Sequence, residues 1–244
     1  MELTKRYYLL IRFLFYKENI HMELDLHEFK FRKYSQCGED KIIELIFQML
    51  SIDKPSWLDI GAGDPIILSN TALFYEKGCR GINIEPNPDF YAKLCEARPE
   101  DTNLNCGVGV EAGTMNYYVI DNYPFLNGFS EENSEKMEKE FGYRIKEAIP
   151  VRIMPIDELI NKYCSLEYPD ILDIDTEGMD LDILSRIDYD RFSPKVIIVE
   201  TVIFGSFRKD TTIKEYLSTK GYAAPYETPM NTIFVRKDCW EKML

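Results

Sequence analysis

Trp57-Leu-Asp-Ile-Gly-Ala-Gly-Asp64 is the stretch that decides the fold, because a short apolar strand runs directly into a turn with two glycines. A second apolar segment, Gly81-Ile-Asn-Ile-Glu-Pro86, ends in a carboxylate. In an open parallel sheet a ligand binds beyond the carboxyl ends of the strands, where glycines let the backbone approach it and an acidic side chain accepts both ribose hydroxyls. The pair predicts a nucleoside site lined by four residues: Asp59, Gly61, Gly63 and Glu85.

The residues after the turn favour one class of nucleoside ligand. A dinucleotide site needs a third glycine and a helix N-terminus aimed at the pyrophosphate. Here Gly63 is followed by Asp64, Pro65 and Ile66, so the third glycine is missing and a negative charge lies where the pyrophosphate would bind. A cationic sulfonium tolerates Asp64 better, which favours S-adenosylmethionine.

Size and charge limit the function classes. The 244 residues suit one domain with a sizeable core, and a net charge of -13 disfavours nucleic acid as a partner, because that attraction depends on clustered Lys and Arg. The six cysteines include no C-x-x-C pair and have no His at ligand spacing, so they indicate neither a zinc site nor a disulfide framework. Reduced thiols suit a cytoplasmic protein.

The N-terminal segment, residues 1-33, is expected to be a helical arm outside the main domain, residues 34-244. Its apolar run from Tyr7 to Tyr16 is interrupted by Arg12, is too short to span a bilayer and lacks a signal-peptide cleavage site. A helix docked on the domain is the favoured interpretation. Peripheral membrane contact through residues 1-20, with basic side chains facing the lipid headgroups, is the alternative.

Apolar periodicity alternates between strand and helix along most of the chain, which predicts an α/β fold with a mostly parallel seven-stranded sheet and helices on both faces. The last two strands lack a helix between them, so the sheet should end in an antiparallel hairpin. The expected strands are 57-60, 81-84, 103-107, 171-174, 196-199, 222-225 and 232-235. The expected helices are 41-50, 69-77, 88-98, 156-163, 181-187 and 212-220. This arrangement resembles the class I methyltransferase fold, a Rossmann-like fold.

Residues 108-150 interrupt the alternation and are expected to form an inserted hairpin. Gly113 to Ile120 alternates like a strand, and Ser130 to Glu140 is expected to be a short solvated helix. The aromatic residues Tyr123, Phe125 and Phe129 lie between these segments and could stack on a sugar or an aromatic acceptor. A substrate lid and a plain surface insertion are equally compatible with this composition.

A second constellation, Pro169-Asp-Ile-Leu-Asp-Ile-Asp-Thr-Glu-Gly178, gathers three carboxylates at the end of a predicted strand. Residues two apart on a strand point the same way, so Asp173 and Asp175 should share a face, with Glu177 just beyond the strand. Buried carboxylates need a cation, a hydrogen-bond network or a catalytic role. The structural alternative is that Asp175 caps the following helix and Glu177 pairs with an Arg.

Several segments together resemble the FkbM-type methyltransferases over about residues 34-236. They are Tyr34-Ser-Gln-Cys-Gly-Glu-Asp40, Asp-Ile-Gly-Ala at 59-62, Ser-Asn-Thr at 69-71, Gly-Cys-Arg-Gly-Ile-Asn-Ile-Glu-Pro-Asn-Pro at 78-88, Ile-Asp-Thr-Glu-Gly at 174-178 and Pro-Lys-Val-Ile-Ile-Val-Glu at 194-200. The resemblance implies S-adenosylmethionine as methyl donor and O-methylation of a small or sugar-like acceptor in glycan or natural-product biosynthesis. Many members have glycine where this chain has Pro65, although a subset carries proline there.

Carried over by position, the resemblance places the glycine turn at the donor and Glu85 on the ribose. It also places Asn105 and Cys106 near the adenine, and Asn70 in the loop that supports the site. Asp175 and Glu177 then face the methyl-transfer region.

Methylation of a sugar hydroxyl calls for a general base or a metal, because the hydroxyl is a poor nucleophile until it loses its proton. The chain's only histidines, His21 and His27, lie in the N-terminal arm with nothing nearby to support a catalytic role. Asp175 or Glu177 is therefore the candidate base, with a raised pKa expected from carboxylate crowding. The same cluster offers the oxygen ligands that Mg²⁺ prefers, although no ligand set points to a metal.

Two other functions stay open on sequence alone: a nicotinamide-dependent oxidoreductase and a non-catalytic protein that binds an adenosyl ligand. The sequence specifies neither the acceptor nor the oligomeric state.

Overall fold

A computed structural model describes residues 34-164, 168-176, 178-203 and 208-244 of the chain. The expected N-terminal arm, including His21, His27 and residues 1-20, lies outside the described residues. So does Glu177, the second candidate base.

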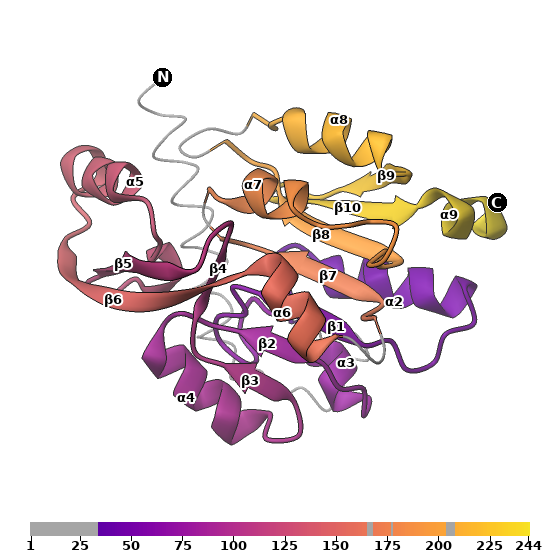
Figure 1. Cartoon of the computed structure of the whole chain (residues 1–244), viewed down its shortest axis with the longest axis horizontal. Helices are drawn as coiled ribbons and strands as arrows, with labels where there is room; N and C mark the ends of the chain where they lie inside the picture. The colour runs from indigo at the N-terminus through magenta and orange to yellow at the C-terminus, as the bar shows by residue number, and fades with distance from the viewer. Residues whose placement is uncertain (1–33, 165–167, 177, 204–207) are drawn as a thin grey trace, which may run out of the picture.

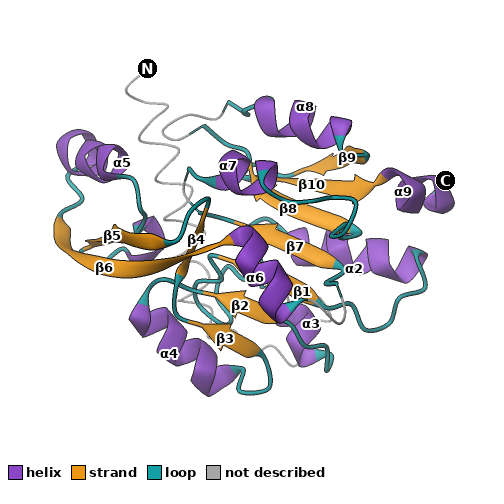
Figure 2. Cartoon of the chain, in the orientation of Figure 1, coloured by secondary structure: helices purple, strands orange, loops and turns teal. Residues whose placement is uncertain are grey.

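The centre of the molecule is a seven-stranded sheet with two layers of helices (Figures 1 and 2). Four neighbouring pairs of strands are parallel, and β10 is antiparallel to both β8 and β9, so the predicted class I architecture with a closing hairpin is confirmed. The strands lie in the order β3 (Thr102–Leu104), β2 (Ile82–Ile84), β1 (Trp57–Ile60), β7 (Ile171–Ile174), β8 (Val196–Glu200), β10 (Asn231–Arg236) and β9 (Tyr222–Glu227).

Alternation along β1 creates a separate core on each face of the sheet. Leu58 and Ile60 pack in a cluster with α6 (Ile156–Tyr163), α7 (Asp180–Ser185) and α8 (Thr212–Thr219). Trp57 packs in a second cluster with α2 (Glu39–Met49), α3 (Ala72–Glu76) and α9 (Lys237–Met243). Asp59 shares the Trp57 face, so a carboxylate enters the layer between the sheet and α3.

A further helix, α4 (Pro88–Ala97), follows β2 and begins beside the site. Asn87 caps it by accepting a hydrogen bond from the Asp89 backbone N–H, and Pro88 occupies the first turn, where the missing N–H costs nothing. The cap fixes the chain directly after Glu85.

The insertion forms a second, three-stranded sheet in the order β4 (Gly107–Gly109), β6 (Ile145–Pro155) and β5 (Gly113–Ile120). The predicted strand at 113-120 is confirmed, and the expected solvated helix is found as α5 (Glu131–Lys136) with a π-helical turn at Met137–Phe141. The long strand β6 was not expected. The strand expected at 103-107 is divided, because β3 ends at Leu104 and β4 starts at Gly107 in the other sheet.

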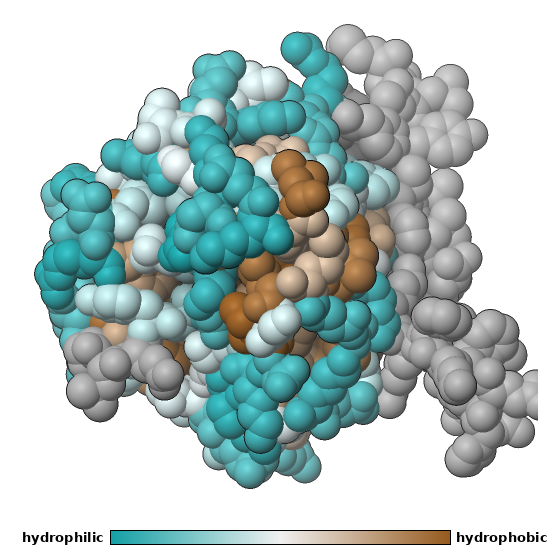
Figure 3. All heavy atoms as spheres, turned by 90° about the vertical axis from the view of Figure 1, so that its right-hand side faces the viewer, coloured by the Kyte–Doolittle hydropathy of each residue, from teal (hydrophilic) through white to brown (hydrophobic). Residues whose placement is uncertain are grey.

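The helices α2 and α9 lie on the right-hand side of the molecule in Figure 1. Figure 3 looks onto this side and shows hydrophobic residues gathered on it. Leu45 and Met49 of α2 are about half exposed, at 49% and 47%. No helix among the described residues has both the length and the apolar composition needed to cross a membrane.

Candidate functional site

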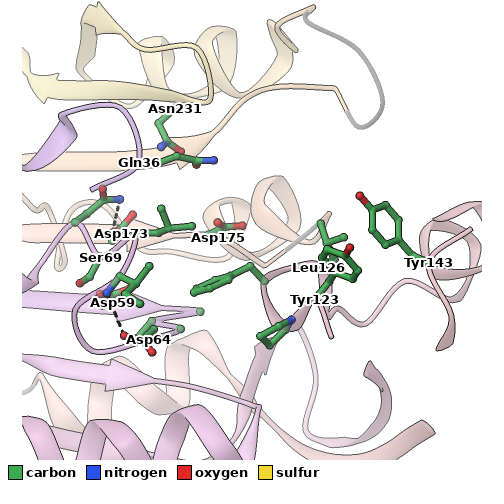
Figure 4. A pocket seen from close by; sticks show the side chains of 18 residues that line it. Gln36, Asp59, Asp64, Ser69, Tyr123, Leu126, Tyr143, Asp173, Asp175 and Asn231 are labelled. Atoms are coloured by element: carbon green, nitrogen blue, oxygen red, sulfur yellow. Dashed lines mark hydrogen bonds between the residues drawn. The ribbon is translucent and has the colours of Figure 1, made fainter. Parts of the chain in front are cut away.

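Two pockets lie at the carboxyl ends of β1, β2 and β7, where the sheet topology predicts a ligand site. We call them the acidic pocket and the apolar pocket. The acidic pocket is lined by Asp59, Asp64, Asp173 and Asp175 together with amide, serine and aromatic side chains (Figure 4). The apolar pocket is lined by Ile84, Glu85, Pro86, Phe90, Cys106 and Val108, among others.

The glycine turn after β1 lies between the two pockets, and Gly61 and Gly63 line both of them. The N–H groups of Gly61 and Ala62 donate to the Ile84 carbonyl at 2.9 and 3.1 Å, which ties the turn to β2. Gly61 has φ +87°, and a Cβ built on it would lie 2.0 Å from the Asp175 carbonyl oxygen. Only glycine fits between β2 and the end of β7 at this position.

Asp59 and Asp173 are register partners across β1 and β7 and are 4% and 6% exposed. Thr71 donates its hydroxyl to Asp59 at 2.8 Å and accepts from Arg98, which is itself buried. Burial raises the pKa of Asp59 to about 6 despite the Thr71 bond and the Arg98 charge.

Asn70 contacts the second carboxylate of this pair. Its Nδ2 donates to Asp173 Oδ2 at 2.9 Å, and both side chains line the acidic pocket. Burial, followed by the charge of Asp59, raises the pKa of Asp173 well above its usual range. This bond ties the loop that carries Asn70 to β7, and the role of Asn70 at the donor stays a prediction.

Asp64 stabilises the loop after the glycine turn. Its Oδ1 accepts from the N–H groups of Ile66 and Ile67 at 3.1 and 3.0 Å, and its Oδ2 lies 3.2 Å from the Lys93 ammonium. The carboxylate also lines the acidic pocket, as the sequence suggested for a residue beside the ligand.

Asp175 follows β7 and lines both pockets, so it lies at their junction. Its N–H donates to the Ile60 carbonyl at 2.9 Å, which fixes the backbone of this residue against β1. The expectation that Asp173 and Asp175 face one site is confirmed. The alternative role of Asp175 as a helix cap is wrong, because α7 starts at Asp180 with Met179 at the N-cap.

Glu85 is 3% exposed and lines the apolar pocket. Its Oε2 accepts from the Gly63 N–H and its Oε1 from the Asn87 N–H, each at 2.7 Å. Each carboxylate oxygen keeps a further lone pair that can accept from a ligand. Burial raises the pKa of Glu85 to about 7, although the two backbone hydrogen bonds oppose the shift.

The two residues expected near the adenine differ in position. Cys106 is buried and lines the apolar pocket. Asn105 lines neither pocket: its amide donates to the carbonyls of Glu85 and Pro86 at 2.8 and 3.2 Å. Asn105 therefore supports the turn after β2 instead of lining the site, because its side chain turns back onto the neighbouring strand.

The insertion also contributes to the site, through aromatic residues that include two named from the sequence, Tyr123 and Phe125. Phe125, in the 3-10 turn Pro124–Leu126, lines both pockets and its ring centroid lies 5.1 Å from that of Phe90. Tyr123 and Tyr143 line the acidic pocket. No sequence pattern singled out Tyr143, which is far from the glycine turn in the sequence.

Gln36 and Asn231 also line the acidic pocket, from opposite ends of the chain. Figure 4 shows them side by side, on the far side of Asp173 from Asp59. Gln36 belongs to the 34-40 segment that the family resemblance includes, whereas no sequence pattern singled out Asn231.

No group of three or more His, Cys, Asp or Glu side chains in the described part of the chain is arranged to hold a metal ion.

Comparisons with known proteins find a family model that matches most of the chain. The family model "Methyltransferase FkbM domain" matches residues 59-223. The structure is similar to the FkbM methyltransferase of Methylobacillus flagellatus KT, with TM-score 0.46 and 16% identity over 75% of this chain and 44% of that one. It is also similar to a precorrin-6y C5,15-methyltransferase from Geobacter metallireducens GS-15, with TM-score 0.38 and 16% identity over 80% and 87% of the two chains.

The chain thus spans less than half the length of the Methylobacillus protein. No curated protein sequence matches it.

Proposed function

Because the chain belongs to the FkbM methyltransferase family, we propose that it takes its methyl group from S-adenosylmethionine and transfers it to a hydroxyl oxygen of a sugar or another small acceptor. The observation that carries this proposal is the junction of the two pockets. An apolar pocket with a buried carboxylate meets an acidic pocket at a glycine turn that lines both.

The apolar pocket fits an adenosine. Phe90, Pro86 and Cys106 offer apolar surface for the base, and Glu85 lies where β2 ends. Its two oxygens accept in the bidentate manner that the 2′ and 3′ hydroxyls of a ribose require. The ribose would therefore bind next to the Gly63 N–H, which holds one of these oxygens in place.

The acidic pocket fits the cationic part of the donor. Four carboxylates line it, and its described lining residues include no Lys, Arg or His. The methionine portion of the donor carries a sulfonium, an α-ammonium and one α-carboxylate, and such surroundings stabilise its net positive charge, whereas a pyrophosphate would be repelled. The charge of the site thus favours S-adenosylmethionine over a nicotinamide dinucleotide.

Bound S-adenosylmethionine supplies an electrophilic methyl group on a sulfonium. The protein's part is to align the acceptor oxygen with that methyl group, exclude water and remove the hydroxyl proton. We assign the proton to a carboxylate oxygen of Asp175, since this residue lies at the junction of the pockets and its backbone is fixed to β1. Asp173 and Asn70 support the neighbouring wall.

The family resemblance supports a proposal for the pathway, and the unpaired cysteines support one for the compartment. We propose that the acceptor belongs to glycan or natural-product biosynthesis and that the protein acts in the cytoplasm. Mg²⁺ is not part of the proposal.

Calorimetric titration of the purified chain tests the donor assignment. The proposal predicts saturable binding of S-adenosylmethionine and S-adenosylhomocysteine and none of NAD⁺. Asp64→Asn, which reduces the negative charge of the acidic pocket, should weaken S-adenosylmethionine more than the uncharged thioether product. Binding of NAD⁺ alone, or of none of the three, would refute the proposal.

A further inference from the structure

Glu39 is a fully buried carboxylate that the methyl-transfer scheme does not use. It is 0% exposed and accepts three hydrogen bonds. Oε1 accepts from the Thr228 hydroxyl at 2.7 Å and from Asn231 Nδ2 at 2.9 Å, and Oε2 accepts from the Cys37 N–H at 2.7 Å. Glu39 therefore joins the segment before α2 to the turn between β9 and β10.

This contact fixes the orientation of the Asn231 amide. A carboxylate oxygen accepts hydrogen bonds, so the amide must present its NH₂ group to Glu39. Asn231 lines the acidic pocket, and Oδ1 is the end of its amide that does not face Glu39. A hydrogen-bond acceptor is thus directed toward the ligand space beside Gln36.

Asn70 repeats the arrangement on the other side of Asp173. Its Nδ2 is bonded to Asp173 Oδ2, so this amide also has its donor end engaged. Both amides and the carboxylate of Asp175 line the acidic pocket, so a ligand meets several acceptors on this polar wall. A ligand group that matches this wall must donate hydrogen bonds.

The opposite wall is aromatic. Tyr123 and Tyr143 line the same pocket, and their ring centroids lie 4.5 Å apart in an edge-to-face arrangement. Figure 4 shows both tyrosines across the pocket from Gln36 and Asn231. A group with hydroxyls on one edge and an apolar C–H face suits such a pair of walls.

We propose that Asn231 and Gln36 form the acceptor subsite and select an uncharged, hydroxyl-rich group, with Glu39 as a positioning residue that fixes the acceptor end of Asn231. The proposal rests on the methyltransferase function above and narrows its substrate class. A phosphate in this subsite would meet the acceptor end of Asn231 and the carboxylate of Asp175 without a described cation in the lining. Discrimination therefore comes from repulsion as well as from the new hydrogen bonds.

The test compares two probes on the protein saturated with S-adenosylhomocysteine: methyl α-D-glucopyranoside and glucose 6-phosphate. Ligand-observed NMR titrations should show saturable binding of the glucoside and at least roughly tenfold weaker binding of the phosphate, the size expected for an unpaired charge. Equal or tighter binding of the phosphate, or binding of neither probe, would overturn the proposal. Absence of S-adenosylhomocysteine binding would instead refute the donor assignment.

Variants separate the subsite from the stability of the fold. Asn231→Leu and Glu39→Gln should each weaken the glucoside roughly three- to tenfold, as loss of one well-oriented hydrogen bond does, with S-adenosylhomocysteine affinity unchanged. Tyr222→Phe is the control for stability. It removes a buried hydrogen bond to the Pro194 carbonyl at 2.7 Å but lines neither pocket, so it should lower the melting temperature and leave glucoside affinity unchanged. Equal loss of glucoside affinity in Tyr222→Phe would show that the losses in the other two variants reflect lowered stability alone.

Discussion

Gly61→Ala is the substitution that tests the geometry of the junction most sharply. The added Cβ would lie 2.0 Å from the Asp175 carbonyl oxygen, far inside van der Waals contact. Neither neighbour can move away easily, because the Gly61 N–H is bonded to Ile84 of β2 and the Asp175 N–H to Ile60 of β1. The substitution must therefore displace backbone within the site.

The expected cost has two parts. An alanine held at a left-handed φ costs about 1–2 kcal/mol, and forcing a methyl group into a filled space costs typically about 1–3 kcal/mol more. Gly61→Ala should thus lower the free energy of unfolding by roughly 2–5 kcal/mol, which for a domain of this size lowers the melting temperature by about 4–20 °C. It should also weaken S-adenosylhomocysteine binding, since the displaced backbone lines both pockets.

Gly63→Ala is the matched control for this substitution. Gly63 also has a positive φ, +61°, but the nearest atom to its added Cβ is a ring carbon of Phe125 at 3.8 Å. Only the conformational cost of about 1–2 kcal/mol should apply. Urea unfolding of both variants measures the difference, and equal stabilities within about 1 kcal/mol, the uncertainty of such additions, would refute the assigned contact between the turn and β7.

Three further substitutions test other parts of the account. The raised pKa of Glu85, about 7 against an ordinary 4.5, means that the folded state keeps a proton that the unfolded state releases. The stabilisation from this proton is complete below pH 4.5, and the free energy of unfolding should fall by about 3 kcal/mol as the pH rises through 7. Urea unfolding of Glu85→Gln at several pH values should lack this fall. Thr71→Val removes the hydroxyl that joins Arg98 to Asp59 and should cost about 1–3 kcal/mol in the same assay; an unchanged stability would mean that this bond is dispensable. Asp175→Asn should lower methyl transfer by roughly 10²- to 10⁴-fold, the range for loss of a general base, with S-adenosylhomocysteine affinity unchanged; near-normal turnover would remove Asp175 from the mechanism.

The central sheet could be predicted because its sequence signals are local. The segments Trp57–Ile60 and Ile171–Ile174 are short apolar strands bounded by polar residues, and the structure has both with the predicted ends. The closing hairpin was predicted because only a few polar residues separate its two strands. Local periodicity determines such elements before any long-range contact is considered.

The insertion was harder to predict because its stability comes from distant partners. β6 contains Pro150 and Pro155, which argue against a strand, yet it pairs with β4 on one side and β5 on the other.

The short helix α9 was missed because its polar composition gives little indication of the single buried residue, Cys239, that anchors it.

Part of the candidate site could be predicted because several of its residues follow local strand signals. Asp59, Gly61, Gly63 and Glu85 lie at strand ends, and a parallel sheet brings strand ends to one edge. Asn105 follows a strand as well, but its side chain turns back to carbonyls of the neighbouring strand, which spacing alone does not reveal. Gln36, Asn231 and Tyr143 come from distant parts of the chain, so only the folded chain shows them together.

A structure of the protein with S-adenosylhomocysteine bound tests the central claim most directly. The account predicts the adenine against Phe90, the ribose hydroxyls on Glu85, and the homocysteine portion in the acidic pocket with its sulfur near Asp175. A ligand that leaves Glu85 without a ribose contact, or that places its adenine in the acidic pocket, would contradict the assignment of the two pockets to one methyl-transfer site.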